Sequence, residues 1–243
     1  MLKIHSLETF GTHDGPGIRL VVFTQGCVFR CTYCHNPDSQ LWDNPKAVEL
    51  SAEEIIEKLE KQKPYLKNGG GITFSGGEPT LQAKELISIC RKIKKAGFHI
   101  TLDTCGAIHT AETRELYDLC DIIMLDVKHI NKEWHQKITN QPNDTVLLNA
   151  AYREKTGQEL WLRYVLVPGW TDQEEYLSEW AQYFSGFKSI TKIQILPYHL
   201  LGVHKYKELG IQYKLDGVRA ANEADALRAK KIFEKYLKNV EIA

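Results

Sequence analysis

The sequence predicts a single-domain α/β fold with a parallel sheet, and three observations support this prediction. Apolar runs of strand length alternate along the chain with amphipathic helical patterns, which is typical of βα units. Several of the runs are continuous, as in residues 21–23 and 122–125, and this suits parallel strands covered on both faces. No stretch rich in Gly, Pro or Ser divides the chain, so we expect a single domain over residues 1–243.

The apolar runs predict six strands. They lie at residues 18–23, 72–74, 99–102, 122–125, 160–167 and 192–196. Six βα units are fewer than the eight of a closed barrel, which favours a partial (β/α)6 barrel, with a doubly wound sheet as the second choice. In either architecture, functional side chains belong at the carboxyl ends of the strands.

Helical patterns separate the strands. They lie at residues 51–66, 80–95, 110–119, 145–155, 171–184 and 220–237. Residues 51–54 read as a capping box that starts the first helix, and residues 171–174 read as a second one. Gly97 is expected to follow the second helix, because glycine readily adopts the left-handed conformation that ends helices.

The bulk properties limit the class of protein. Lys+Arg and Asp+Glu number 31 each, so the formal net charge of zero does not favour binding to nucleic acid or to an anionic membrane. The first residues lack the apolar core of a signal peptide, and no apolar run approaches the roughly 18 residues of a membrane span. We therefore expect a cytoplasmic protein whose six cysteines are reduced thiols or metal ligands. A monomer is a separate expectation, which these properties do not establish.

Three cysteines lie close together, at Cys27, Cys31 and Cys34, directly after the first strand. Thiolates are the usual ligands of iron–sulfur clusters, and most clusters take four of them. A cluster with three protein ligands leaves one iron open for a small molecule, and an open position is typical of a catalytic metal site.

Other interpretations of these cysteines remain. The first is that they are ordinary buried cysteines, which does not explain their tight spacing. The second is a structural zinc site with His35 as the fourth ligand. Residues 31–35 also match the C-x-x-C-H pattern of haem attachment, which is expected in exported proteins. Of the other cysteines, Cys90 and Cys120 fall on helical patterns and are expected in the core, and Cys105 is expected to fill a small position after a strand.

A second signal is the glycine-rich end of the second strand, residues 75–79, although a plain turn would look similar. Glycines there would let the backbone approach a ligand closely. Polar residues also lie in or after the later strands, namely Asp103, Thr104, Asp126, Lys128, Arg163 and His199. Together they would surround one site at the carboxyl ends of the strands, as a polar cofactor requires.

These motifs together resemble the radical S-adenosylmethionine (SAM) superfamily and, within it, the activases of glycyl-radical enzymes. The resemblance covers nearly the whole chain. It runs in family order through residues 11–19, 25–36, 75–78, 102–104, 124–128, 163–170, 196–199 and 213–218. Larger activases carry a cysteine-rich insert after the cluster loop. Residues 36–69 contain no cysteine, which favours the smaller type that acts on pyruvate formate-lyase.

The resemblance implies the roles of individual residues. It implies a [4Fe–4S] cluster on Cys27, Cys31 and Cys34, with SAM on the open iron. The implied SAM contacts are Tyr33, Cys34, His35, Gly77, Glu78, Asp126, Val127, Lys128, Arg163 and His199. The residues that match a monovalent-cation site for Na⁺ or K⁺ are Asp103, Thr104, Met124 and Asp126. Asp14 and His35 match positions that meet the glycine-bearing peptide.

The implied reaction is reductive cleavage of SAM to a 5′-deoxyadenosyl radical, which takes a hydrogen atom from a glycine Cα of pyruvate formate-lyase. Flavodoxin or ferredoxin is the implied electron donor. Two other hypotheses are a radical SAM enzyme that acts on a small heterocycle, as deazaguanine synthases do, and a non-catalytic zinc or electron-transfer protein.

Overall fold

The computed structural model describes residues 1–243, and the chain packs as two compact units. The first unit consists of residues 1–28 and 39–124, and the second of residues 29–38 and 125–243. The chain therefore leaves the first unit briefly at the cysteine loop before it returns. The prediction of one domain over the whole chain stays a prediction.

The sheet of the first unit combines parallel and antiparallel strands. Its strands are β1 (Leu2–Gly11), β2 (Arg19–Thr24), β3 (Val48–Leu50), β4 (Gly71–Gly76) and β5 (His99–Thr104), in the order β3-β1-β2-β4-β5. β4 is parallel to both β2 and β5, whereas β1 is antiparallel to β2 and β3. The sequence did not predict β1 or β3, because β1 is largely polar beyond Ile4 and β3 has only three residues.

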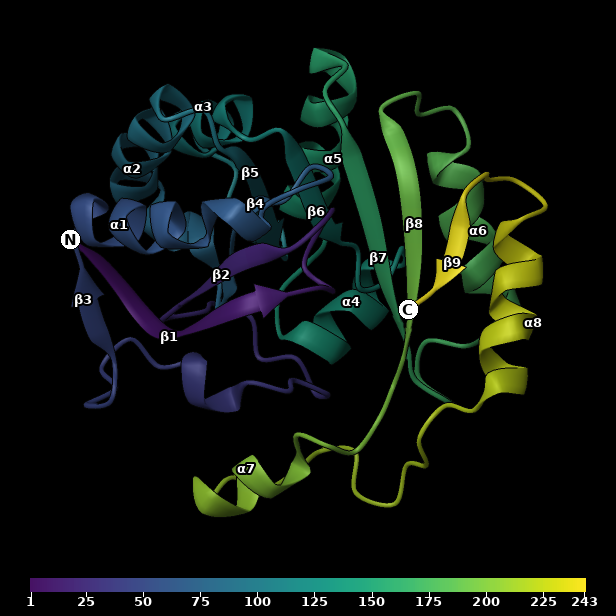
Figure 1. Ribbon diagram of the computed structural model, residues 1–243. Helices are drawn as coiled ribbons and strands as arrows, with labels where there is room; N and C mark the ends of the chain where they lie inside the picture. Colours follow the sequence, from purple (N-terminus) through teal and green to yellow (C-terminus); the bar gives the residue numbers. More distant parts are fainter. The chain divides into compact units, whose positions relative to one another are not determined.

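Three helices follow these strands, with α2 in contact with both of the others (Figure 1). They are α1 (Ala52–Gln62), α2 (Ala83–Lys95) and α3 (Ala111–Leu119). The predicted capping box of α1 is confirmed, with Ser51 and Glu54 each accepting from the other's amide at 3.1 and 2.8 Å. Gly97 has a φ of +82° directly beyond α2, as predicted. Short 3-10 turns lie at η2 (Lys63–Tyr65) and η3 (Pro79–Gln82).

The strand β6 (Ile122–Asp126) carries the chain into the second unit, where β7 (Leu160–Leu166), β8 (Ile190–Pro197) and β9 (Val240–Ile242) pair in parallel. All six predicted strands are present, and the predicted α/β class is confirmed. The sheet is mostly parallel rather than wholly so, because β1 pairs antiparallel with β2 and β3. The helices of this unit are α4 (Lys132–Thr139), α5 (Asp144–Thr156), α6 (Glu174–Phe184), α7 (Val203–Glu208) and α8 (Glu223–Phe233). A short turn, η1 (Pro37–Ser39), follows the cysteine loop.

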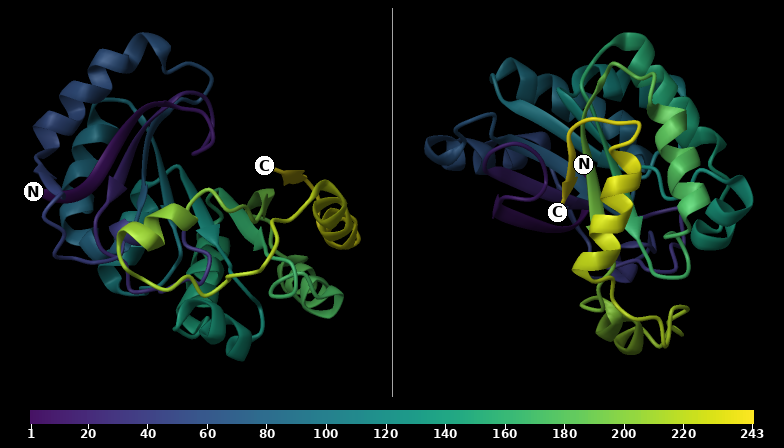
Figure 2. Two further views of the ribbon diagram at one scale, coloured as in Figure 1. Left: turned by 90° about the horizontal axis from the view of Figure 1, so that it is seen from below. Right: turned by 90° about the vertical axis from the view of Figure 1, so that its right-hand side faces the viewer.

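Aromatic side chains form the core between α6 and α8, which lie side by side in Figure 2. The ring of Trp180 stacks on that of Phe233 with a centroid separation of 4.8 Å, and Tyr164 from β7 meets both rings edge-on. These rings are fully buried, so this packing contributes several kcal/mol by area burial alone. It fixes β7, the strand that carries Arg163.

The second predicted capping box is wrong. α6 begins at Glu174, and its N-cap residue Gln173 makes no capping hydrogen bond. The Thr171 hydroxyl instead donates to the Val165 carbonyl and accepts from the Val167 amide, each at 2.7 Å. Backbone groups at the end of β7 therefore compete successfully for a hydroxyl that the local pattern assigned to the helix.

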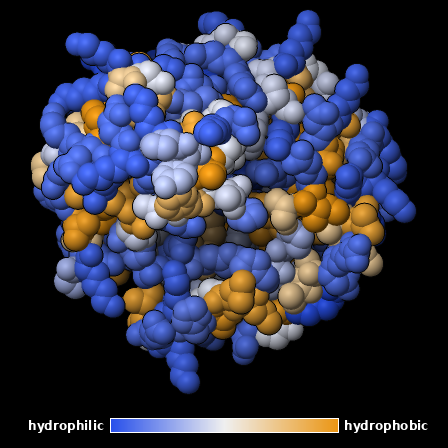
Figure 3. Space-filling model, in the orientation of Figure 1, coloured by the Kyte–Doolittle hydropathy of each residue, from blue (hydrophilic) through white to orange (hydrophobic).

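The surface contains scattered apolar residues rather than a spanning segment. The face drawn in Figure 3 is mostly hydrophilic, with small hydrophobic patches between charged side chains. None of the helices combines the length and the apolar composition that a membrane crossing requires.

One consequence of this packing concerns acid stability. His135 of α4 is fully buried, and burial lowers its pKa to about 4, although the Gln141 carbonyl lies 2.8 Å from its Nδ1. The unfolded chain binds this proton near pH 6.5, so stability should fall from about pH 6.5 to 4, at up to about 1.4 kcal/mol per pH unit.

We expect the substitution His135→Gln to make the unfolding free energy less dependent on pH between 7 and 5. Part of the dependence should remain, because burial also lowers the pKa of His129 to about 4. Urea unfolding at both pH values measures the effect, with the exposed His204→Gln as the control. If the unfolding free energy of His135→Gln changes between pH 7 and pH 5 as much as that of the unmodified protein, burial of His135 does not cause the pH dependence.

Candidate active site

The backbone of the cysteine loop is held at both of its ends. In the first unit, the amide of Cys27 donates to the Gln40 carbonyl at 3.0 Å, and the amide of Gly26 donates to the Ser39 carbonyl at 2.8 Å. These two bonds join the residues that leave β2 to the residues where the chain returns. Cys27 is thereby fixed directly beyond the carboxyl end of a parallel strand.

In the second unit, the loop is held by the carboxyl end of α4. The amides of Arg30 and Thr32 donate to the carbonyls of Thr139 and Ile138 at 2.8 and 2.9 Å. The last carbonyls of a helix have no partner within the helix, so they are free to accept from a neighbouring segment. The sequence did not predict α4, and this helix sets the position of the stretch that carries Cys31 and Cys34.

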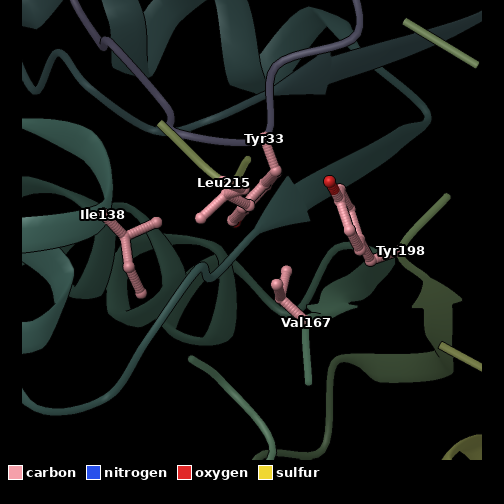
Figure 4. Close-up of a cluster of buried hydrophobic side chains, with 5 residues drawn as sticks. All are labelled: Tyr33, Ile138, Val167, Tyr198 and Leu215. Atoms are coloured by element: carbon pink, nitrogen blue, oxygen red, sulfur yellow. The ribbon is translucent and has the colours of Figure 1, made fainter. Parts of the chain in front are cut away.

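A hydrophobic cluster lies beneath this stretch. Its buried members, drawn in Figure 4, are Tyr33, Ile138, Val167, Tyr198 and Leu215. Cys31 packs against its edge. The Tyr33 hydroxyl is buried without a hydrogen-bond partner, which is costly unless a bound group supplies one. This orphaned hydroxyl therefore favours a polar ligand close to the cysteines.

Gly77 brings the end of β4 against the cysteine loop. Its amide donates to the Thr24 carbonyl at 2.9 Å, and the amide of Glu78 donates to the Gly26 carbonyl at 2.7 Å. A Cβ added at Gly77 would lie 2.1 Å from the Gly26 oxygen, far inside any allowed contact. The backbone approach that the glycine-rich motif predicted is therefore present, and its partner here is the residue before Cys27.

The Glu78 side chain is buried within the first unit. Its carboxylate accepts five hydrogen bonds, two from Thr80, one from the Thr104 hydroxyl, and two from the amide and thiol of Cys105. These donors use the carboxylate fully, as a buried charge requires. A contact of this residue with SAM would thus involve its backbone rather than its carboxylate.

The residues predicted for a cation site lie at the ends of β5 and β6. Asp103 accepts from the Ser75 hydroxyl at 2.6 Å and is partly exposed, whereas the Thr104 hydroxyl is already bonded to Glu78. Met124 is fully buried. Asp103 and Thr104 thus occupy the carboxyl end of β5, where the sequence placed them.

Asp126, the last residue of β6, carries a charge that two cations stabilise. Burial alone would raise its pKa, but Arg163 and Lys128, at 3.0 and 2.6 Å, outweigh this and lower the pKa to about 2. The Val127 amide donates to the Arg163 carbonyl at 3.1 Å. These four predicted SAM contacts therefore form one connected group in the second unit.

Two histidines form the other polar group of this unit. The rings of His35 and His199 stack with centroids 4.0 Å apart, and His35 Nε2 lies 3.2 Å from the His199 carbonyl. Burial lowers the pKa of His35, and His199 lowers it further. A neutral imidazole is therefore favoured beside the cysteines.

Some residues that shape this region were not predicted. The Tyr206 hydroxyl donates to the Cys34 carbonyl at 3.0 Å, and the Lys205 ammonium donates to the Asn36 side chain at 3.0 Å. A Cβ at Gly202 would lie 2.9 Å from the His35 Cα. α7, which carries the first two, has only six residues and gives no periodic signal, so only the structure could reveal these contacts.

Asp14 lies on a loop that the buried Arg19 organises. The guanidinium donates to the Pro16 and Gly69 carbonyls at 2.9 and 3.1 Å and also to the Thr73 hydroxyl. That hydroxyl in turn donates to the Asp14 carbonyl at 2.6 Å. The loop is therefore held by backbone contacts, and the Arg19 in the predicted motif serves to anchor it.

Residues 21–181 match the family model of the Radical SAM superfamily. The chain is 41% identical over 239 residues to the pyruvate formate-lyase-activating enzyme of Listeria monocytogenes, covering 96% of both chains. It is also 41% identical over 248 residues to the enzyme of that name from Streptococcus mutans, covering 98% of this chain and 94% of the relative.

Solved structures show the same fold at low sequence identity. Streptococcus suis SuiB bound to its precursor peptide SuiA has a TM-score of 0.71 at 16% identity, covering 93% of this chain and 48% of that one. A domain of pyruvate-formate lyase-activating enzyme from Bacteroides vulgatus has a TM-score of 0.61 at 23% identity, covering 72% and 99%. The chain thus belongs to the radical SAM superfamily and, within it, to the family of pyruvate formate-lyase-activating enzymes.

Membership of this superfamily implies a [4Fe–4S] cluster and SAM. The residues present fit both groups. None of the six cysteines is in a disulfide, so three thiols within eight residues are available as soft ligands. The orphaned Tyr33 hydroxyl in the second unit also fits a polar cofactor beside that loop.

The contact at Gly77 can be tested by adding one methyl group. We expect the substitution Gly77→Ala to push the Gly26 carbonyl away and to destabilise the first unit by about 1–3 kcal/mol. Iron content after anaerobic reconstitution should fall as the loop shifts. The matched control is Gly186→Ala, where a Cβ meets open space. Equal iron content and equal thermal stability in the two variants would contradict the assignment.

Proposed function

We propose that this chain activates pyruvate formate-lyase by generating a glycyl radical. The observation that carries the proposal is the three-cysteine loop within a chain that matches activating enzymes of that name over 96% of its length. The similarity does not favour the heterocycle hypothesis, and membership of the radical SAM superfamily does not favour a zinc protein.

In this proposal Cys27, Cys31 and Cys34 hold the [4Fe–4S] cluster. When bound, the reduced cluster would supply one electron for the cleavage of SAM to methionine and a 5′-deoxyadenosyl radical, the species that would take a hydrogen atom from a glycine Cα of the partner. The contribution of the chain is positioning, because hydrogen abstraction needs no protein acid or base. The anchored ends of the loop support this role.

The proposed SAM contacts have distinct chemistry. The backbone of Gly77 and Glu78 offers polar groups to the methionyl part, since the Glu78 carboxylate is already fully hydrogen-bonded. Tyr33 offers a hydroxyl without a partner. The further contacts proposed from the family motifs are Cys34, His35, Asp126, Val127, Lys128, Arg163 and His199.

The charges of the second unit favour a zwitterionic ligand. Asp126 stays ionised and can attract an ammonium or sulfonium group, while Lys128 and Arg163 can attract a carboxylate. SAM carries groups of both signs. We further propose that Asp103, Thr104, Met124 and Asp126 bind a monovalent cation and that Asp14 and His35 meet the glycine-bearing peptide.

The remaining parts of the proposal concern partners and location. Flavodoxin or ferredoxin is proposed as the electron donor, and the protein is proposed to work as a monomer in the cytoplasm. The balanced formal charge supports the absence of nucleic-acid binding.

Electron paramagnetic resonance tests the function directly. Reconstituted, reduced protein mixed anaerobically with SAM and pyruvate formate-lyase should give a persistent glycyl-radical doublet and an equivalent amount of 5′-deoxyadenosine. SAM cleavage that rises with a heterocycle, and no doublet with pyruvate formate-lyase, would overturn the proposed partner. Zinc without iron or sulfide in the purified protein would overturn the enzyme class.

The substitution Cys31→Ala is expected to abolish the doublet and to lower the iron content, because two thiolates cannot retain the cluster. Cys90→Ala is the matched control, since Cys90 is a buried thiol of α2 that has no place in the loop. Full activation by Cys31→Ala would refute the assignment of ligands.

A further inference from the structure

The last of the three loop cysteines, Cys34, is held through both of its backbone groups. Its amide donates to the Cys31 carbonyl at 3.2 Å, which closes a turn between these two cysteines. Its carbonyl accepts from the Tyr206 hydroxyl of α7 at 3.0 Å. The backbone from which the Cys34 thiol extends is therefore fixed on both sides. The proposed reaction assigns no role to Tyr206.

Two other tyrosines hold the Tyr206 side chain in place. The buried Tyr206 ring meets the Tyr213 ring edge-on, with the ring centroids 4.8 Å apart. The hydroxyls of Tyr213 and Tyr198 lie 2.5 Å apart, and Tyr198 belongs to the hydrophobic cluster beneath the cysteine stretch. A hydroxyl supported in this way by packed side chains keeps a defined direction, as a positioning group must.

Neighbours of Tyr206 hold the residues that follow Cys34. A Cβ at Gly202 would lie 2.9 Å from the His35 Cα, so the two backbones are in close contact. The Lys205 ammonium donates to the Asp38 carboxylate at 3.3 Å. In the second unit, α4 thus holds the stretch before the third cysteine, whereas the segment around α7 holds that cysteine and the stretch after it.

We propose that Tyr206 is a positioning residue for the third cluster ligand, because its hydroxyl fixes the backbone from which the Cys34 thiolate binds iron. The inference rests on the proposed function only in taking Cys34 as a ligand. A ligand whose backbone is already ordered loses less conformational entropy when it binds, and partners that orient a ligand strengthen metal binding. Tyr206 thus slows the loss of iron from the assembled cluster.

The test is the substitution Tyr206→Phe in the reconstituted full-length protein. It keeps the ring against Tyr213 and removes the hydroxyl that holds Cys34. We expect iron to pass to the chelator bathophenanthroline disulfonate about threefold to tenfold faster under anaerobic conditions, the range of one net hydrogen bond. The electron paramagnetic resonance lines of the reduced cluster should also broaden, because a less fixed ligand allows a wider spread of cluster geometries.

The matched control is Tyr164→Phe in the same unit. Tyr164 is also buried, and its hydroxyl also donates to a backbone carbonyl, that of Thr171, at 2.6 Å. The two substitutions remove the same kind of bond, so both should lower the thermal stability. Tyr164→Phe should leave the iron-release rate and the line widths unchanged. An iron-release rate in Tyr206→Phe equal to that in Tyr164→Phe would overturn the inference.

If Tyr206→Phe does not fold, Tyr213→Phe is measured in its place. This variant keeps the Tyr206 hydroxyl but removes the hydroxyl that joins Tyr213 to Tyr198, so the support of the Tyr206 ring is weakened. Its iron release should be faster than that of Tyr164→Phe. Equal rates in these two variants would then overturn the inference.

These outcomes separate the inference from the proposed partner, because iron release and line widths are measured without pyruvate formate-lyase. Faster release in Tyr206→Phe, with no glycyl radical from the unmodified protein on pyruvate formate-lyase, would support the role of Tyr206 and overturn the partner. A glycyl radical from the unmodified protein, with equal release rates in Tyr206→Phe and Tyr164→Phe, would do the reverse.

Discussion

Water does not reach the carboxyl group of Glu78, and a buried polar group is tolerated only where hydrogen-bond partners replace its hydration. Those donors come from the turn after β4 and from the end of β5, while the Glu78 amide bonds to the residue before Cys27. Glu78 therefore links three adjacent strand ends, two through its side chain and the third through its backbone amide. The cysteine loop begins at the end of β2, so its starting point depends on the backbone of Glu78.

The second unit stabilises a carboxylate in another way. Asp126 is balanced by two cations rather than by neutral donors, which keeps a compact set of opposite charges at the end of β6. The first arrangement fixes the backbone, and the second holds the charged groups that we propose as SAM contacts. The two together suit a radical enzyme, in which the protein orients reactants and leaves the bond cleavage to the cofactor.

Much of the fold could be predicted because continuous apolar runs such as those of β4 and β6 depend on local sequence alone. The missed elements have weak local signals, as with the polar strand β1 and the short helix α7. The capping pattern at Thr171 failed for a related reason, since its hydroxyl found partners on β7. The wrong or missing predictions thus concern elements whose position depends on contacts with residues that are distant in the sequence.

The sequence by itself determined the α/β class, the cysteine loop and the family, because the type of each ligand residue and the spacing between ligands follow directly from the order of the residues. Only the tertiary structure decided what each side chain faces. It turned the Glu78 carboxylate inward, placed α4 under the loop, and brought Cys105 to Glu78. These contacts join residues up to about a hundred positions apart, and packing brings such residues together without leaving a periodic pattern in the sequence.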